Sequence, residues 1–273
     1  MTSFSIKTAD IKDLIEISLN AGKAIMDIYE SDTEIRIKDD LSPLTKADLV
    51  SNEIICKSLL KIYPKIPIIS EESSKIDYKK RSNWLNYWLV DPLDGTKEFI
   101  NRNGEFTTNI AMIHKNRPIF GIIHAPERNE TYWGDANNGS FFLEGDSDSN
   151  EKRIKVSKKG NTKLRILTSR SHPSTKLESL LGALDEYEII EMGSSLKFCH
   201  IAKGEADFYM RFGPTSEWDT AAGDAILEFA GGNVCDLNGG RIKYNVKESY
   251  LNRDFIASRS MELSLSLKKI ISS

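Results

Sequence analysis

The sequence contains little cysteine, and its cysteines form no recognisable pattern. Only three occur among 273 residues, Cys56, Cys199 and Cys235, and no Cys-x-x-Cys spacing is present. An odd number of isolated cysteines argues against a disulfide framework or a zinc cluster and favours a reducing compartment. We therefore expect each thiol to be a small core side chain, and we expect a cytoplasmic protein.

Long apolar runs and an excess of positive charge are also missing. No stretch approaches 18 apolar residues, so no transmembrane helix is predicted. The first 19 residues carry charges throughout, which is not typical of a secretory signal. A net charge of −3 gives no basic field for nucleic acid. With 40% hydrophobic residues, the chain has the composition of a globular protein with a sizeable core.

The first half of the sequence predicts two helices followed by a β-rich block. Helical spacing of apolar residues indicates a helix over residues 8–30. Residues 38–44 are predicted as a loop, after which Thr45 and Asp48 form a capping box for a helix that ends near Ile62. Apolar runs broken by turn residues predict strands over 66–69, 88–90, 107–114, 119–125, 130–133 and 139–143.

The second half alternates between strand and helix. We predict strands over 164–168, 187–191, 206–210 and 255–258, and helices over 174–184, 195–203, 219–230 and from about residue 260. The polar segment 144–152 is the predicted linker. We therefore expect an N-terminal α+β domain, residues 1–150, and a C-terminal α/β domain, residues 151–273, built as layers of sheets and helices.

Carboxylates occur where predicted elements begin or end. Glu71 and Glu72 follow one strand, Asp91 and Asp94 follow another, and Asp219 opens a helix. The ends of strands are where α/β proteins build ligand sites. Converging carboxylates repel one another unless a cation lies among them, and oxygen ligands without matching His or Cys favour magnesium.

Each of these residues also has a simpler structural interpretation. A Glu-Glu pair is commonly solvated surface, and an Asp at a helix start is commonly a cap. Asp48 fits the capping box and the helix dipole without any catalytic role. Both interpretations stay open for each residue taken singly.

The segment Asp91-Pro92-Leu93-Asp94-Gly95-Thr96 allows a sharper test. Haloacid-dehalogenase-type phosphatases carry D-x-D-G-T after a hydrophobic strand, with the first Asp as nucleophile. Here two residues separate the aspartates and Pro92 stiffens the turn, which disfavours a nucleophile. Both carboxylates and the Leu93 carbonyl can instead face a pair of cations. Gly95 and Thr96 then present backbone N–H groups at a helix start, where a phosphate binds well.

Three motifs in this order resemble those of a known superfamily. "SEE" at 70–72, "DPLDGTKEF" at 91–99 and "WDTAAG" at 218–223 are similar to the lithium-sensitive, magnesium-dependent inositol monophosphatase-like phosphatases. The resemblance implies their layered sandwich of alternating helices and sheets. "GSSLKFC" and "RFGPTSEWDTAAGDA" further resemble the CysQ-type 3'(2'),5'-bisphosphate nucleotidases. Those enzymes remove the 3'-phosphate from 3'-phosphoadenosine 5'-phosphate and leave AMP.

The resemblance implies a role for each matching residue. Two or three Mg²⁺ ions would be held by Glu71, Asp91, the Leu93 carbonyl, Asp94 and Asp219. Glu71 and Thr96 would orient and deprotonate a water molecule, with Asp48 hydrogen-bonded to Thr96. The substrate would contact Gly95, Thr96, Lys197, Arg211 and Asp219.

Two of these assigned residues also have a structural explanation, and two further residues near them receive no role. Lys197 is explained almost as well as a solvated helix lysine, and Arg211 almost as well as a strand-end arginine. Inositol-type members carry a Glu near the position of Arg211, and a cation suits a substrate with a second phosphate. The resemblance assigns no role to Glu217 or Asp224.

The expected partner is a small phosphonucleotide, with no nucleic acid and no integral membrane segment. The resemblance leaves peripheral association with the inner membrane face open, and the sequence does not determine the oligomeric state. An inositol monophosphatase or other sugar-phosphate phosphatase is the alternative function. A catalytically silent protein that binds phosphonucleotides or metal on the same fold is a third hypothesis, although every expected ligand residue is present.

Overall fold

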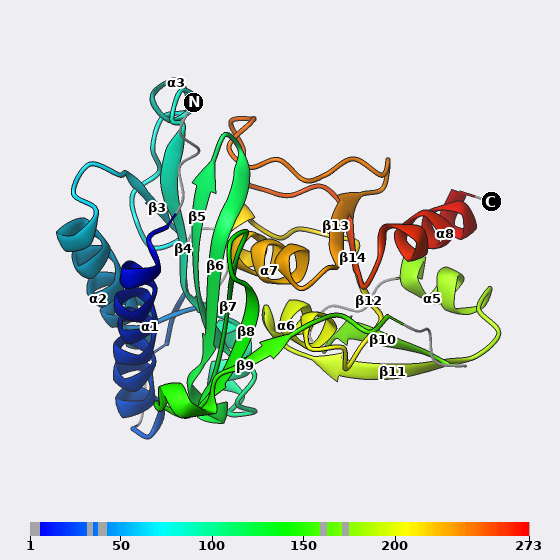
Figure 1. Cartoon of the computed structure of the whole chain (residues 1–273), viewed down its shortest axis with the longest axis horizontal. Helices are drawn as coiled ribbons and strands as arrows, with labels where there is room; N and C mark the ends of the chain where they lie inside the picture. Colours follow the sequence, from blue (N-terminus) through cyan, green and yellow to red (C-terminus); the bar gives the residue numbers. More distant parts are fainter. Residues whose placement is uncertain (1–5, 32–34, 38–42, 159–162, 171–174, 273) are drawn as a thin grey trace.

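The computed structural model describes residues 6–31, 35–37, 43–158, 163–170 and 175–272. Two sheets organise this part of the chain, with helices between them and outside each of them (Figure 1). A two-stranded pair, β1 (Ile35–Ile37) with β2 (Pro43–Thr45), precedes them. Residues 38–42 of the predicted loop lie outside the described residues, and Pro43–Thr45 is a strand instead.

The first sheet has seven strands in the order β3-β4-β5-β6-β7-β8-β9. Only β3 and β4 are parallel, and every later pair is antiparallel. The strands are β3 (Ile68–Ser70), β4 (Asn86–Asp94), β5 (Thr107–His114), β6 (Arg117–Ala125), β7 (Glu130–Asp135), β8 (Gly139–Glu144) and β9 (Lys152–Ile154).

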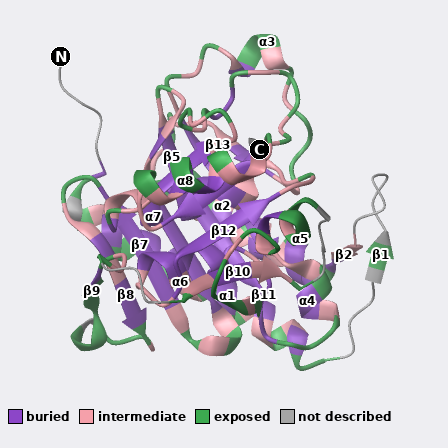
Figure 2. Cartoon of the chain, turned by 90° about the vertical axis from the view of Figure 1, so that its right-hand side faces the viewer, coloured by how far each residue is buried: buried purple, intermediate pink, exposed green. Residues whose placement is uncertain are grey.

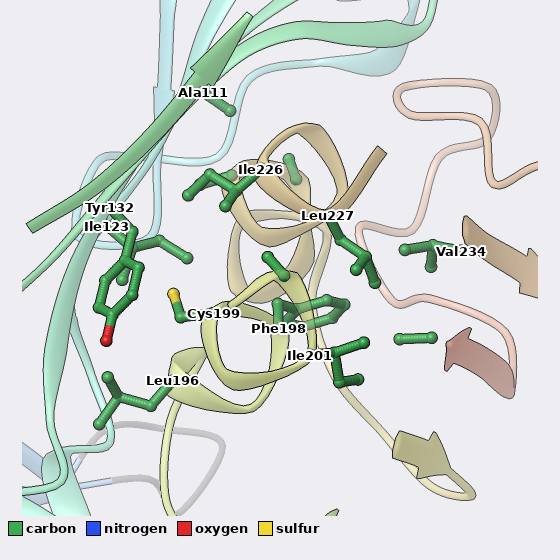
Figure 3. Close-up of a cluster of buried hydrophobic side chains, with 14 of the residues drawn as sticks. Ala111, Ile123, Tyr132, Leu196, Phe198, Cys199, Ile201, Ile226, Leu227 and Val234 are labelled. Carbon is green, nitrogen blue, oxygen red and sulfur yellow. The ribbon is translucent and has the colours of Figure 1, made fainter. Parts of the chain in front are cut away.

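Both faces of this sheet are buried because successive side chains of a strand point to opposite faces. Trp88 and Val90 pack with α1 (Thr8–Tyr29) and α2 (Lys46–Ile62). Tyr87 and Leu89 belong to the core that contains α6 (Leu196–Ala202) and α7 (Glu217–Phe229). Figure 3 shows this second core, where Phe198 and Leu227 of the helices lie opposite Ala111 and Tyr132 of the sheet.

The second sheet has five strands in the order β11-β10-β12-β14-β13. Its strands are β10 (Leu164–Ser169), β11 (Tyr187–Met192), β12 (Phe208–Arg211), β13 (Asn233–Asp236) and β14 (Phe255–Ser258). One face joins the α6 and α7 core, and the other packs on α5 (Thr175–Leu181) and α8 (Met261–Ser272). The layers are therefore helices, sheet, helices, sheet, helices, and the buried residues follow the sheets and their inner helices (Figure 2).

The layered α+β fold expected from the sequence is confirmed, with several local corrections. The strand expected over 88–90 is nine residues long, and the helix expected from residue 219 begins at Glu217. The predicted linker 144–152 contains the short helix η2 (Asp148–Asn150) and the start of β9, whose backbone pairs with β8. The sequence pattern did not predict β13 or the short helices α3 (Tyr78–Arg81) and η1 (Pro126–Arg128), whereas the helix start expected at Gly95-Thr96 is that of α4 (Thr96–Ile100).

We keep the division near residue 150 as a proposal. The first sheet ends at Ile154 and the second begins at Leu164, so a boundary at residue 150 falls just before β9, the last strand of the first sheet. However, α6 and α7 come from the second part and share one core with the first sheet. Among the described residues, no helix is both long and apolar enough to cross a membrane.

Candidate active site

A cleft of about 1780 Å³ opens where β3 and β4 end and where α4, α6 and α7 begin. Loop residues 73–77 and 248–251 form part of its rim. All but one of the predicted site residues line it, namely Glu71, Asp91, Leu93, Asp94, Gly95, Thr96, Lys197, Arg211 and Asp219. The exception is Asp48, which lies behind Thr96. The folding of the chain thus gathers residues that span 149 positions of sequence, from 71 to 219, into one cavity.

A bulge at the end of β4 brings Asp91 and Asp94 toward the same cleft. Asp91 pairs with Asn109 of β5, whereas Asp94 pairs with Thr107, so β4 holds one extra residue at this point. In a regular strand, two residues three apart would face opposite sides of the sheet. The extra residue of a bulge reverses that alternation and redirects the second side chain. This is the physical reason that the two-residue spacing of D-P-L-D serves a shared site.

The cleft carboxylates act on each other electrostatically. Burial raises the pKa of Asp91 well above its usual range, and the nearby charges of Glu71, Asp94 and Asp219 raise it further. A hydrogen bond between the Asp91 and Glu71 side chains adds to this effect. The pKa of Asp219 is likewise raised well above the usual value, by burial first and then by Asp94 and Glu71. A group of acids that repel one another in this way is stabilised by a cation.

The donor set fits a hard divalent cation, because it consists of carboxylate oxygens with a backbone carbonyl close by. Within the part of the chain that the structure describes, however, no three His, Cys, Asp or Glu side chains already surround a single point as metal ligands do. The carboxylates nevertheless line one cavity and raise one another's pKa values.

Asp94 is held by two polar residues that the sequence did not reveal. The Ser195 hydroxyl lies 2.5 Å from Asp94 Oδ2 and 2.6 Å from the Asp219 carbonyl oxygen. It accepts a hydrogen bond from the Asn109 side-chain amide at 2.9 Å, and that amide also donates to Asp94 at 3.3 Å. Because a hydroxyl has one proton, Ser195 donates to one oxygen at a time. These bonds lower the pKa of Asp94, although burial outweighs them and the pKa is raised overall.

Asp219 occupies the third position of α7, in a capping box. Its Oδ2 accepts the Ser216 backbone N–H at 2.9 Å, and Ser216 is the N-cap. The sequence interpretation of Asp219 as a cap and its interpretation as a cleft ligand are therefore compatible. One oxygen fixes the side chain at the helix start while the residue lines the cleft.

Asp48 likewise has two kinds of contact, one that caps a helix and one with a residue of the cleft. Its Oδ2 accepts the backbone N–H and the hydroxyl of Thr45, both at 2.7 Å, which completes the predicted capping box of α2. Its Oδ1 accepts the Thr96 hydroxyl at 3.3 Å, and that hydroxyl also lies 3.3 Å from the Leu93 carbonyl. The start of α2 therefore fixes the hydroxyl of a cleft residue 48 positions later.

Gly95 makes the turn from β4 into α4 possible. It is the N-cap of α4, with φ of +87°, a conformation that glycine adopts at little cost. A Cβ at this position would lie 3.1 Å from the Glu105 carbonyl oxygen. The expected helix start at Gly95-Thr96 is therefore present, and Thr96 is the first residue of α4.

Lys197 is a buried cation, so its interpretation as a solvated helix lysine is wrong. It is only 5% exposed and donates to the carbonyls of Ser194 at 2.6 Å and Met192 at 3.2 Å. Burial lowers the pKa of Lys197 to about 8, while the Asp94 charge opposes that shift.

Arg211 is also buried, at 7% exposure, and donates to the Pro214 carbonyl at 3.0 Å. Its Nε is buried and has no hydrogen-bond partner within the described residues. A buried, unsatisfied donor of this kind is costly unless a ligand completes it. Lys197 and Arg211 therefore place two cations in the same cleft as the acids.

The layered fold and this acidic cleft with buried cations define a phosphatase-like site that suits a metal ion and an anionic substrate. A family model described as the inositol monophosphatase family matches residues 8–272. The chain belongs to the inositol monophosphatase family, which confirms the prediction made from the motifs. The family is one of metal-dependent phosphatases.

Individual relatives and solved structures show which members of the family the chain is similar to. The chain is 42% identical over 247 residues to the 3'(2'),5'-bisphosphate nucleotidase CysQ of Salmonella typhimurium, which covers 90% of this chain and 98% of that protein. The CysQ of Buchnera aphidicola is 43% identical, with coverage of 90% and 92%. The crystal structure of CysQ from Bacteroides thetaiotaomicron is similar with a TM-score of 0.81 and 36% identity, covering 92% of this chain and 97% of that one. The Thermotoga maritima inositol monophosphatase has a TM-score of 0.79 at 22% identity, with 97% of both chains covered, and so shares the fold.

Proposed function

We propose that this protein is a 3'(2'),5'-bisphosphate nucleotidase that hydrolyses the 3'-phosphate of 3'-phosphoadenosine 5'-phosphate to give AMP and phosphate. The single observation that carries this assignment is the combination of mutually interacting carboxylates with the buried cations Lys197 and Arg211 in one cleft. The identity of about 42% to proteins named 3'(2'),5'-bisphosphate nucleotidase supports the choice of substrate.

The proposed cofactor is magnesium, as two or three ions. Glu71, Asp91, the Leu93 carbonyl, Asp94 and Asp219 would hold them. When bound, magnesium neutralises phosphate charge and lowers the pKa of a water molecule, which phosphate-ester hydrolysis requires because the uncatalysed reaction is extremely slow.

The chain itself positions the attacking water and moves its proton in this proposal. The Thr96 hydroxyl, fixed by Asp48 at 3.3 Å, would hold the water together with the Glu71 carboxylate. Glu71 would accept the proton, since a nearby carboxylate is a competent general base. Asp48 would keep the Thr96 hydroxyl oriented, because its second oxygen is already committed to Thr45.

The remaining residues would bind the two phosphate groups and so position the ester bond that is hydrolysed. The backbone N–H groups of Gly95 and Thr96 would hold the scissile phosphate at the start of α4. Lys197 and Arg211 would bind the remainder of the nucleotide beside Asp219, and the unsatisfied Nε of Arg211 favours an anionic partner there. In-line displacement by water then needs no covalent enzyme intermediate.

An inositol monophosphatase or related sugar-phosphate phosphatase is the second candidate, favoured by the shared fold of the Thermotoga maritima enzyme. Inositol 1-phosphate carries one phosphate group, and its neutral cyclitol ring would leave the buried Arg211 donor without a second anion. A silent binding protein is less well supported, because all the expected ligand residues line the cleft. We further propose that the protein acts in the cytoplasm, which suits its three unpaired cysteines.

A direct assay separates the two catalytic candidates. Phosphate release is measured with magnesium from 3'-phosphoadenosine 5'-phosphate and from inositol 1-phosphate, and kcat/KM is compared. The nucleotidase proposal predicts a higher kcat/KM for the bisphosphate nucleotide. Preference for inositol 1-phosphate would refute it, and hydrolysis of neither substrate would favour the binding protein.

A further inference from the structure

Arg81 is a buried cation at the edge of the cleft, apart from the carboxylates. It is 1% exposed and lies at the end of α3. Its guanidinium donates to the Asn245 side-chain oxygen and to the Glu248 carbonyl, and its Nε lies 3.3 Å from the Ile76 carbonyl. The Tyr250 ring lies 4.0 Å from the guanidinium carbon. Burial of a cation is costly, so a side chain with this many partners is fixed firmly in place.

Asn245 connects Arg81 to the start of α7. Its side-chain amide returns a hydrogen bond to the Arg81 carbonyl at 2.6 Å. Its backbone N–H lies 2.9 and 2.8 Å from the two carboxylate oxygens of Glu217. Glu217 is the first residue of α7, two positions before Asp219. We call this chain of contacts, Arg81 to Asn245 to Glu217, the brace.

Backbone contacts attach the segment that contains Asn245 to the same helix start. The Glu217 N–H donates to the Tyr250 carbonyl at 2.8 Å, and the Asn252 N–H donates to the Thr215 carbonyl at 2.7 Å. Ser216 and Leu251 form a β-bridge. Segment 245–252 is therefore fixed to the residues that precede Asp219 independently of Arg81.

Residues 72–81, in the connection between β3 and β4, contain little regular secondary structure. We call this segment the lobe. Its regular secondary structure is the four-residue helix α3, which lies at the top of the molecule in Figure 1 and is partly exposed in Figure 2. Residues 73–79 nevertheless line the cleft. The Arg81 side chain ties this wall of the cleft to segment 245–252 and through it to α7.

We propose that the brace holds the lobe in its substrate-binding position relative to Asp219, and that Arg81 and Asn245 are positioning residues for substrate binding. The lobe carries none of Asp91, Asp94 and Asp219, and the Glu71 N–H is held by the Val90 carbonyl at 3.2 Å. Loss of the brace would therefore leave the carboxylates in place, but the lobe would be in its substrate-binding position in only a fraction of the molecules. The apparent affinity for substrate is reduced by that fraction, whereas in the substrate complex the lobe is ordered.

The variant Asn245→Gly cuts the brace at one point. Asn245 has φ of +57°, which glycine adopts readily, and the substitution keeps the backbone N–H that donates to Glu217. Only the Asn245 side-chain amide is lost, and with it the hydrogen bonds to the Arg81 guanidinium and the Arg81 carbonyl. With magnesium present, KM for the substrate should rise about tenfold while kcat stays within about twofold. Amide hydrogen exchange over residues 72–81 should become faster, and saturating substrate should slow it again.

Asn233→Ala is the matched control, because it also removes a buried amide, which donates to Ser264 at 3.1 Å between β13 and α8. It should lower the melting temperature without changing KM or the exchange of the lobe. An unchanged KM in Asn245→Gly, or a change equal to that of the control, would overturn the proposal. If Asn245→Gly does not fold, Arg81→Lys, which keeps the charge with fewer donors, is judged by the same criteria.

The inference rests on the proposed function only for the choice of substrate. If the wild type prefers inositol 1-phosphate, the nucleotidase proposal fails, and the brace is then tested with inositol 1-phosphate. The two failures are therefore distinguishable.

Discussion

The hydroxyl of Ser195 lies 2.5 Å from the carboxylate of Asp94, although 101 positions separate them in the sequence. The same hydroxyl lies 2.6 Å from the Asp219 carbonyl, so one small side chain joins the end of β4 to the starts of α6 and α7. Asp94 is a proposed metal ligand, and replacement of a residue that orients such a ligand typically lowers metal affinity roughly 10- to 100-fold.

Removal of this hydroxyl should weaken magnesium activation. Ser195→Ala deletes the donor to Asp94, and we expect the magnesium concentration for half-maximal activity to rise roughly 10- to 100-fold. The measurement is initial rate against magnesium concentration at saturating substrate. Ser140→Ala removes another buried hydroxyl, 2.7 Å from the Ile226 carbonyl, and serves as the control. An unchanged magnesium dependence in Ser195→Ala would show that its contact with Asp94 is only structural.

The Thr96 hydroxyl should matter for turnover rather than for folding. Thr96→Val keeps the shape of the side chain but cannot donate to Asp48, so we expect kcat to fall roughly 10²- to 10⁴-fold. Thr96→Ser retains the hydroxyl and should stay close to the wild type. Both are measured at saturating magnesium and substrate, and equal kcat values for the two variants would contradict the proposed role.

Gly121 fixes the distance between the first sheet and α7. A Cβ at this position would lie 2.3 Å from the Ala222 carbonyl oxygen, so Gly121→Ala must push α7 away from β6. We expect roughly 1–3 kcal/mol lower free energy of unfolding, measured by denaturant titration. At Gly182 the closest atom to an added Cβ is 3.6 Å away, so Gly182→Ala should change stability by less than about 0.5 kcal/mol. Equal effects at the two positions would disprove the close packing.

Asp224 should make the stability depend on pH. Burial raises the pKa of Asp224 to about 7, against the lowering effect of Arg117. A raised pKa means that the folded state binds the proton more tightly, so this contribution is complete below about pH 4 and is lost as pH rises through about 7. The free energy of unfolding of the wild type should therefore fall relative to Asp224→Asn between pH 5 and pH 8, by on the order of 2–4 kcal/mol. Denaturant titrations at both values test this, and a constant difference would contradict the shift.

Much of the fold follows from local patterns, and the exceptions share a cause. The capping box of Thr45 and Asp48 predicted the start of α2 because both partners lie within one helical turn. In contrast, β13 follows two glycines and is a strand because its backbone pairs with β14, about twenty residues later. β9 carries Lys152 and Arg153 and pairs with β8 at the edge of the sheet, where backbone bonds rather than apolar side chains define the strand.

The same distinction applies to the site. Glu71, Asp91, Asp94 and Asp219 could be proposed from the sequence because their motifs are compact and specific. Ser195 and Asn109 contact Asp94 only in the folded chain, and nothing in their sequence neighbourhood signals this contact. Burial of Lys197 also depends on the packing of α6 between two sheets, which periodicity alone does not determine.

We propose that the carboxylates of the cleft hold magnesium for phosphate-ester hydrolysis. The variant Asp94→Asn tests this proposal. The measurement is magnesium-dependent phosphate release, together with circular dichroism and thermal melting. Asp135→Asn is the control and should retain activity, because this buried carboxylate lies at the end of β7 and accepts backbone N–H groups of the turn to β8. We expect Asp94→Asn to fold normally and to lose turnover by roughly 10³-fold or more. Turnover close to that of the wild type would contradict the proposal.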